Sequence, residues 1–229
     1  MPHFRAFTPE ELKFVSGFKR GELVAETGAT ILAEGAHSAQ LFTLLSGWAF
    51  RFKTLEDGRR QILNYVLPGD LIGLQGSVIG AMEHSVEALS PVVLCVFQRD
   101  GLSDLYKKQP GLSFDVTWLA AREERMLDEN LISIGRRSAV ERAAYLIVFM
   151  HQRAAGAGLT TRKLLIPITQ QHVADTLGLS LVHTNKTLRK LAERKLIRWH
   201  DRACEVMDVK GLMDIAGWEG LPERQRPLI

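Results

Sequence analysis

The chain has 229 residues, of which 46% are hydrophobic and 24% are charged, and its formal net charge is +3. These values are typical of one or two globular domains with a sizeable core. No apolar run approaches the roughly 20 residues of a membrane-spanning helix, and the N-terminal residues are too polar for a signal peptide. Two cysteines are too few for a disulfide framework or a cysteine-based zinc site, so we expect a cytoplasmic protein without membrane association.

The charge is distributed unevenly along the chain. Residues 1–134 contain 13 Lys+Arg and 17 Asp+Glu, a net charge of −4, whereas residues 135–229 contain 16 and 9, a net charge of +7. A basic C-terminal part favours a polyanionic partner, although an ordinary solvated surface would give the same count.

The first predicted elements are a short helix and a series of strands. Thr8 can cap a helix in the stretch TPEELKFVSGF. Between residues 21 and 98, glycine separates short apolar runs, and every second residue from Trp48 to Phe52 is aromatic, which is the period of a half-buried strand. Asp57-Gly58 predicts a hairpin turn. We therefore expect a β sandwich or barrel in residues 1–111.

From residue 112 the apolar spacing becomes helical and predicts one long helix over 112–135. Its apolar positions form more than a narrow stripe, so that one side can pack on the β domain and another on a partner helix. We expect Val116, Leu119 and Met126 to line the interface of a homodimer. Glu123 interrupts a strict heptad pattern, and a helix at the solvent edge is the alternative.

Residues 136–229 are predicted to form a winged helix-turn-helix. Thr169 can cap a first short helix, Gly178 permits a tight turn, and Ser180 can cap a second helix. The stretch 196–209 alternates around a turn, as a β-hairpin wing would.

The second helix of this motif has one apolar face, made by Leu181, Thr184, Leu188 and Leu191. Its opposite face carries side chains that can reach phosphates and base edges in a major groove. We expect four of them to read bases, namely Val182, His183, Asn185 and Lys186. We expect the DNA backbone to be contacted by Thr169, Gln170, Gln171, Ser180 and Arg189. The alternative is the solvent-facing side of an ordinary helical hairpin.

Three stretches together resemble the Crp/Fnr family of bacterial transcription regulators. They are LPGDLIGL at 67–74, SAVERAAYLIVFM at 138–150 and IPITQQHVADTLGLSLVHTNKTLRKLAERKLI at 166–197. The resemblance covers about Phe14 to Val209 and implies an α+β fold. Its parts would be a cyclic-nucleotide-binding-like β-roll (1–111), a long dimerisation helix (112–135) and a C-terminal winged helix-turn-helix (136–229). It also implies a homodimer on palindromic double-stranded promoter DNA, with RNA polymerase as a further partner.

The residues that match the family's cyclic-nucleotide cassette depart from it. Cyclic-nucleotide-binding members carry Gly-Glu-Leu and a later Arg-Ser, and those places hold Gly73-Leu74-Gln75 and His84-Ser85 in this chain. A neutral imidazole cannot replace a guanidinium fork on a phosphate, which argues against cyclic AMP. The residues that would bind an effector are therefore unknown.

Other cofactors of the family are also not predicted. Iron–sulfur members use cysteines that lie mostly near the N-terminus, and here none precedes Cys95. A carbon-monoxide-sensing member binds haem through Cys and His in the segment that matches GDLIGLQG, where this chain has Gly73 and Gln75. The remaining candidates for haem ligands are Pro2, His3 and His84, but a frayed terminus and a polar loop explain them more simply. A sensor that depends on haem or another small ligand remains one alternative.

A second alternative is an adaptor that has lost DNA binding, against which the basic residues of the second helix argue. No nucleophile elbow, phosphate-binding glycine loop or paired-histidine metal motif is present, so neither an enzyme nor a metal site is predicted. Cys95 lies in the apolar run PVVLCVF, as a buried residue would. The position of Cys204 in the wing leaves open whether its thiol is exposed and oxidisable.

Overall fold

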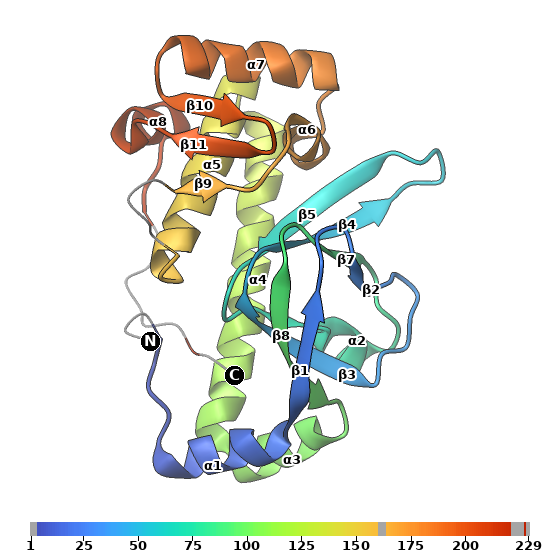
Figure 1. Cartoon of the computed structure of the whole chain (residues 1–229). Coiled ribbons are helices and arrows are strands. Elements are labelled where there is room, and N and C mark those ends of the chain that lie inside the picture. The colour runs from blue at the N-terminus through green and yellow to red at the C-terminus, as the bar shows by residue number, and fades with distance from the viewer. Residues whose placement is uncertain (1–3, 160–163, 221–226, 228–229) are drawn as a thin grey trace. The chain divides into compact units, whose positions relative to one another are not determined.

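The computed structural model describes residues 4–159, 164–220 and 227 (Figure 1). The chain divides into two compact units. Of the described residues, the first contains 4–53, 65–125 and 227, and the second contains 54–64, 126–159 and 164–220. The long helix is thus shared between the units, and the tip of one β-hairpin belongs with the C-terminal part, whereas the sequence suggested three consecutive segments.

The β-rich part of the chain is built on antiparallel sheets with the strand orders β1-β8-β3-β6 and β2-β7-β4-β5, and residues 60–64 of β5 belong to the second unit. The strands of the first sheet are β1 (Lys19–Ala25), β3 (Gln40–Ser46), β6 (Leu71–Ile72) and β8 (Val92–Gln98). Those of the second are β2 (Thr30–Leu32), β4 (Ala49–Thr54), β5 (Arg60–Val66) and β7 (Ser85–Ala88). The expected turn at Asp57-Gly58 joins β4 to β5, and Gly58 takes the positive φ of +82° that such a turn favours.

The core of the β-rich part is mainly aliphatic and includes Phe42. At the start of β4, side chains on both faces of the strand are buried. Ala49 belongs to the cluster that includes Leu44, Val86 and Leu94, whereas Phe50 is buried on the opposite face. The expected alternation of buried aromatic and exposed residues from Trp48 to Phe52 therefore fails at Ala49. Its small side chain packs in the core because the second face of the strand is covered as well.

Four helices surround these strands: α1 (Pro9–Phe18), α2 (Leu74–Ile79), α3 (Gly101–Lys108) and α4 (Pro110–Arg136). Thr8 caps α1 as predicted, with Glu11 completing a reciprocal capping box. Helix α4 is continuous, as the apolar spacing indicated, and begins two residues earlier than expected.

The residues expected at a dimer interface lie inside their own chain. Val116 and Leu119 are only 1% and 8% exposed and pack with Phe18 and Phe97 of the first unit. Met126 is 6% exposed, and its Sδ accepts a hydrogen bond of 3.6 Å from Asn64 Nδ2 in the second unit. This placement corrects the expectation, because side chains already covered by their own chain cannot line a partner's surface.

The second unit contains the predicted helix-turn-helix. Helix α5 (Ala139–Gly156) begins at a capping box of Ser138 and Glu141, and it contacts both α6 (Gln170–Leu177) and α7 (Leu181–Glu193). A sheet of order β10-β11-β9 forms the wing, from β9 (Leu165–Ile166), β10 (Ile197–His200) and β11 (Ala203–Val206). Helix α8 (Val209–Ala216), which the sequence analysis did not identify, packs against α5.

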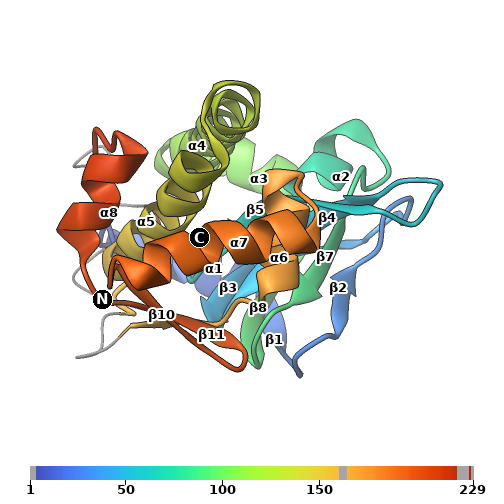
Figure 2. The same cartoon turned by 90° about the horizontal axis from the view of Figure 1, so that it is seen from above.

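Figure 1 shows α7 at the top of this unit, above α6 and the wing, and in Figure 2, which is seen from above, α7 lies toward the viewer. None of the helices that the structure describes is long and apolar enough to cross a lipid bilayer.

Candidate nucleic-acid interface

The angle between α6 and α7 is fixed by local hydrogen bonds that the sequence predicted. The hydroxyl oxygen of Thr169 accepts the backbone N–H of His172 at 3.2 Å. Gly178 ends α6 in the left-handed region, with φ +64°. Ser180 then caps α7 by accepting the backbone N–H of His183 at 3.3 Å. Because each cap also satisfies an otherwise unpaired N–H, the turn between the helices is well determined.

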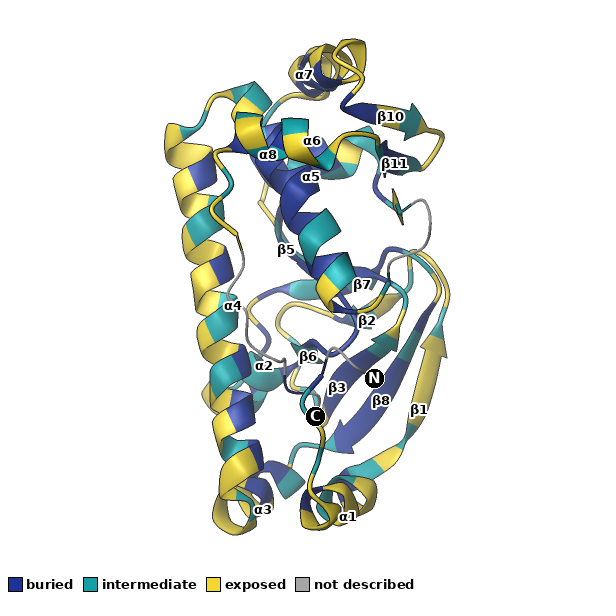
Figure 3. Ribbon diagram, turned by 90° about the vertical axis from the view of Figure 1, so that its left-hand side faces the viewer, coloured by how far each residue is buried: buried dark blue, intermediate teal, exposed yellow. Residues whose placement is uncertain are grey.

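The outward face of α7 is the one expected from sequence. Its exposed side chains are Val182, His183, Asn185, Lys186, Arg189 and Lys190, and Figure 3 shows exposed residues along this helix. The inward residues Thr184, Leu188 and Leu191 are buried, together with Thr187, whose hydroxyl donates to the carbonyl of His183 at 2.9 Å. Leu181 was expected on the buried face, but it is exposed in the first turn of α7.

The basic side chain of Arg189 is held only weakly. Its Nε lies 3.2 Å from Glu193 Oε1, and both side chains are mostly exposed, so this pair contributes little stability and can open when a phosphate approaches. Lys186 is exposed one turn earlier on the same helix. The outward face therefore offers cations that can neutralise phosphate or donate to guanine.

Helix α6 contributes polar groups at its N-terminal end. Thr169 and Gln170 are half-buried, and Gln171 is exposed. Gln171 Nε2 donates to Asp175 Oδ1 at 2.6 Å, which holds the Gln171 amide near the surface of the helix. The capping hydroxyls of Thr169 and Ser180 accept one hydrogen bond each and can still donate their own proton to a phosphate oxygen.

The wing holds a buried thiol and a buried acid. Cys204 is fully buried, and burial together with the charge of Glu205 raises the pKa of its thiol to about 12. The structure therefore settles the question of its exposure, because the thiol is covered and protonated at neutral pH. Glu205 accepts a hydrogen bond of 3.0 Å from His200 Nε2 if that nitrogen carries the proton, and it lies 3.6 Å from Arg198 Nη1.

The segment of the first unit that matches the family's cyclic-nucleotide cassette contains a buried histidine, His84. His84 is 4% exposed, and its Nε2 accepts a hydrogen bond of 2.9 Å from Arg51 Nε. Burial and the charges of Arg51 and Lys53 lower the pKa of His84 to about 3, so its ring is neutral at physiological pH. Arg51 also forms an ion pair with Glu123 of α4.

This network bears on the haem candidates. The Nε2 atom of His84 already accepts the hydrogen bond from Arg51, so it would have to leave that partner to bind iron. Pro2 and His3 lie outside the described residues. Among the residues that the structure describes, no group of three or more His, Cys, Asp or Glu side chains could hold a metal ion.

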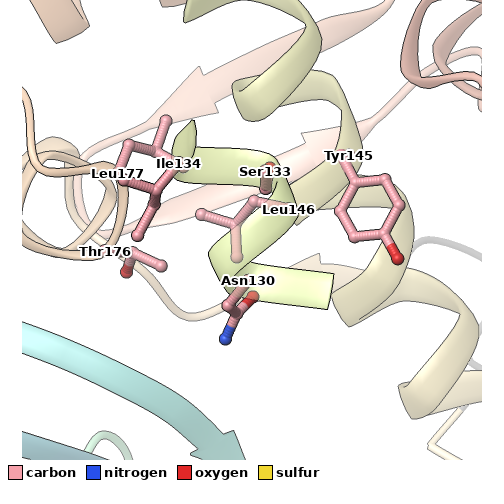
Figure 4. Close-up of a pocket in the computed structure, with 7 residues that line it drawn as sticks. All are labelled: Asn130, Ser133, Ile134, Tyr145, Leu146, Thr176 and Leu177. Atoms are coloured by element: carbon pink, nitrogen blue, oxygen red, sulfur yellow. The ribbon is translucent and has the colours of Figure 1, made fainter. Parts of the chain in front are cut away.

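The second unit has a small pocket beside the end of α4 (Figure 4). It is lined by Asn130, Ser133, Ile134, Tyr145, Leu146, Thr176 and Leu177. The Asn130 amide donates to the carbonyl of Leu63 at 2.7 Å, so its polar group has a structural partner. We do not assign an effector to this pocket.

Comparison with known proteins agrees with this architecture. The family model "Cyclic nucleotide-binding domain" matches residues 22–109, and "Crp-like helix-turn-helix domain" matches residues 141–215. The nitrogen fixation regulation protein FixK of Bradyrhizobium diazoefficiens is 30% identical over 165 residues, which are 72% of this chain and 69% of that protein. The transcriptional activatory protein AadR of Rhodopseudomonas palustris is 29% identical over 180 residues, covering 79% of this chain and 74% of AadR.

The fold has close structural counterparts. The structure of FixK2 from Bradyrhizobium japonicum superimposes with a TM-score of 0.75 at 23% identity, covering 85% of this chain and 96% of FixK2. A β-roll of the cyclic-nucleotide-binding type followed by a helix-turn-helix defines a class of DNA-binding transcription regulators. The chain belongs to the Crp/Fnr family of that class. Members of this family are regulators rather than enzymes.

The neutral state of His84 makes the stability of the fold dependent on pH. An unfolded histidine takes up a proton near pH 6.5, whereas folded His84 cannot do so until about pH 3. The free energy of unfolding should therefore fall as the pH is lowered from 6.5 toward 4, by up to about 1.4 kcal/mol per pH unit for this residue. Urea unfolding between pH 7 and pH 4.5 measures this slope.

Replacing His84 by Gln tests the assignment, because a glutamine oxygen can accept the hydrogen bond from Arg51 but does not titrate. His84→Gln should reduce the slope, whereas His37→Gln on the surface should leave it unchanged. Equal slopes for the wild type and His84→Gln would contradict the assignment. Since burial also lowers the pKa of His172, to about 4, some slope should remain in His84→Gln.

Proposed function

We propose that the chain acts as a homodimer on palindromic promoter DNA in the cytoplasm and does not require a cyclic nucleotide, an iron–sulfur cluster or haem. The observation that supports DNA reading best is the outward face of α7, which is exposed, basic and fixed in direction by the caps around Gly178. RNA polymerase is the expected further partner, since the relative AadR is named a transcriptional activatory protein.

We expect two groups of residues on this surface to have different roles, one reading bases and one contacting the DNA backbone. Four side chains lie on the part of α7 that would face base edges, where Lys can donate to guanine and Asn can pair with adenine; they are Val182, His183, Asn185 and Lys186. Thr169, Gln170 and Gln171 on α6 would hold the phosphate backbone with Ser180 and Arg189, which fixes the register of the recognition helix.

Lys186→Ala and Arg189→Ala should separate base reading from phosphate contact. Lys186→Ala should cost about 1–3 kcal/mol on the best site and relax the preference at one base position. Arg189→Ala should weaken binding to all sequences similarly and lower the salt slope by roughly 1. Binding selections from randomised DNA measure both effects. An unchanged preference in Lys186→Ala, or a changed one in Arg189→Ala, would reverse these roles.

The partner surface on α4 must use residues that its own chain leaves uncovered. Leu127, Leu131 and Ile134 are all exposed, Leu131 to 71%, and their spacing of four and three residues places them on one stripe of the helix. An apolar stripe of this spacing matches the seam of a pair of packed helices. We propose that it contacts the same stripe of a second copy.

Leu131→Asp should give monomers, because burying an unpaired carboxylate in the seam is strongly unfavourable. The matched control is Ile132→Asp, since Ile132 is also exposed but points about 100° away from Leu131 around the helix. Sedimentation at micromolar concentration and the affinity for whole and half operator sites measure the outcome. A Leu131→Asp dimer of unchanged affinity would exclude this stripe.

The absence of a nucleotide requirement is supported by the side chains that stand at the cassette positions. Leu74 offers no acceptor for a ribose hydroxyl, and neutral His84 offers no charge for a phosphate. Arg51, which donates to His84, is already paired with Glu123, so the link between β4 and α4 forms without a ligand.

We expect calorimetry to show no saturable binding of cyclic AMP or cyclic GMP at micromolar concentration and the protein to bind its operator without either. Stoichiometric nucleotide binding would mean that another residue of the cassette neutralises the phosphate. An absorption spectrum and native mass of the freshly purified protein would reveal haem or another bound molecule. Failure to bind any DNA at low salt would favour an adaptor.

A further inference from the structure

The hairpin between β4 and β5 contacts the first helix of the helix-turn-helix. The hairpin segment, residues 54–64, lies in the same compact unit as α6. Arg60 Nε donates to Asp175 Oδ2 at 2.9 Å, and Gln61 Nε2 donates to the backbone carbonyl of Thr176 at 3.0 Å. The residues of each pair are 115 positions apart in the chain.

One of these contacts caps the end of α6, and the other is a partly buried ion pair. Thr176 lies in the last turn of α6, where carbonyl groups have no partner within the helix, and the Gln61 amide supplies one. The side chains of Arg60 and Asp175 are 25% and 11% exposed, so their ion pair is screened less than a surface pair.

The carboxylate of Asp175 connects the hairpin to the DNA-facing end of α6. While Oδ2 accepts from Arg60, Oδ1 accepts the amide of Gln171 at 2.6 Å. Gln171 is one of the side chains that would contact the DNA backbone. Arg60 therefore fixes the orientation of the carboxylate that holds Gln171, and it also balances a negative charge that would repel phosphate.

A second route runs through His172. Its Nδ1 accepts the backbone N–H of Thr169 at 3.2 Å, which requires an unprotonated nitrogen. Burial, followed by the positive charge of Arg60, lowers the pKa of His172 to about 4, whereas Asp175 acts in the opposite direction. Arg60 thus favours the neutral ring that completes the cap of α6 at Thr169.

We infer that Arg60 and Gln61 are positioning residues for DNA binding, which hold α6 from outside the helix-turn-helix through Asp175 and Thr176. This inference rests on the proposed DNA binding and extends it to a segment that does not itself touch DNA. Because the contacts support the phosphate-binding helix and not the outward face of α7, their loss weakens binding to every sequence alike.

The test is Arg60→Gln in the full-length protein, with Arg59→Gln as the matched control. Arg59 is the neighbouring arginine of the same hairpin, and its partner is Asp57 rather than a residue of α6. Arg60→Gln should weaken operator binding about tenfold, with the base preference in randomised-site selections unchanged, while Arg59→Gln stays within about twofold. Arg60→Lys, which keeps the charge, should recover part of the loss.

A double-mutant cycle separates positioning from a general loss of stability. In an Asp175→Asn background, Arg60→Gln should cost no more than about twofold, because the carboxylate that links Arg60 to Gln171 is already neutral and only the effect of Arg60 on His172 remains. Tighter binding by Arg60→Gln, a changed base preference, or equal losses in both backgrounds would overturn the inference. If wild-type protein binds no DNA, the proposed function fails instead, so the two failures are distinguishable.

Discussion

Helix α4 carries two sets of apolar side chains, one buried in its own chain and one exposed to solvent. The rest of the structure depends on which residues belong to each set. Its N-terminal half places Val116 and Leu119 in the core of the first unit, beside aromatic residues of α1 and β8. Its C-terminal half leaves Leu127 and Leu131 uncovered. Because one helix serves both, a change in its rotation would move the buried and the exposed residues together.

Local signals in the sequence were sufficient for the helix-turn-helix. The caps at Thr169 and Ser180 and the left-handed turn at Gly178 each depend on residues three or four positions away, and all three were identified correctly. The outward residues of α7 follow from the same 3.6-residue period. The elements nearest to DNA were therefore the most predictable ones.

Contacts between segments far apart in the chain could not be predicted from such local signals. The apolar spacing of α4 showed which residues needed cover but not which surface would supply it, and Val116 was therefore assigned to a partner instead of its own chain. The contact between Arg60 and Asp175 joins residues 115 positions apart, and no local pattern marks it. His84 was read as part of a polar loop because its burial depends on Arg51, which lies on another strand.

Both cysteines are buried with their thiol pKa raised, Cys204 most strongly. A thiolate reacts with maleimides and similar reagents, whereas a protonated, covered thiol does so slowly. A third cysteine introduced on an exposed surface would therefore react well before the two native ones. The native chain thus provides a low background for fluorescent or spin labels, by which movements of α7 and the wing on DNA can be followed without removing either natural cysteine.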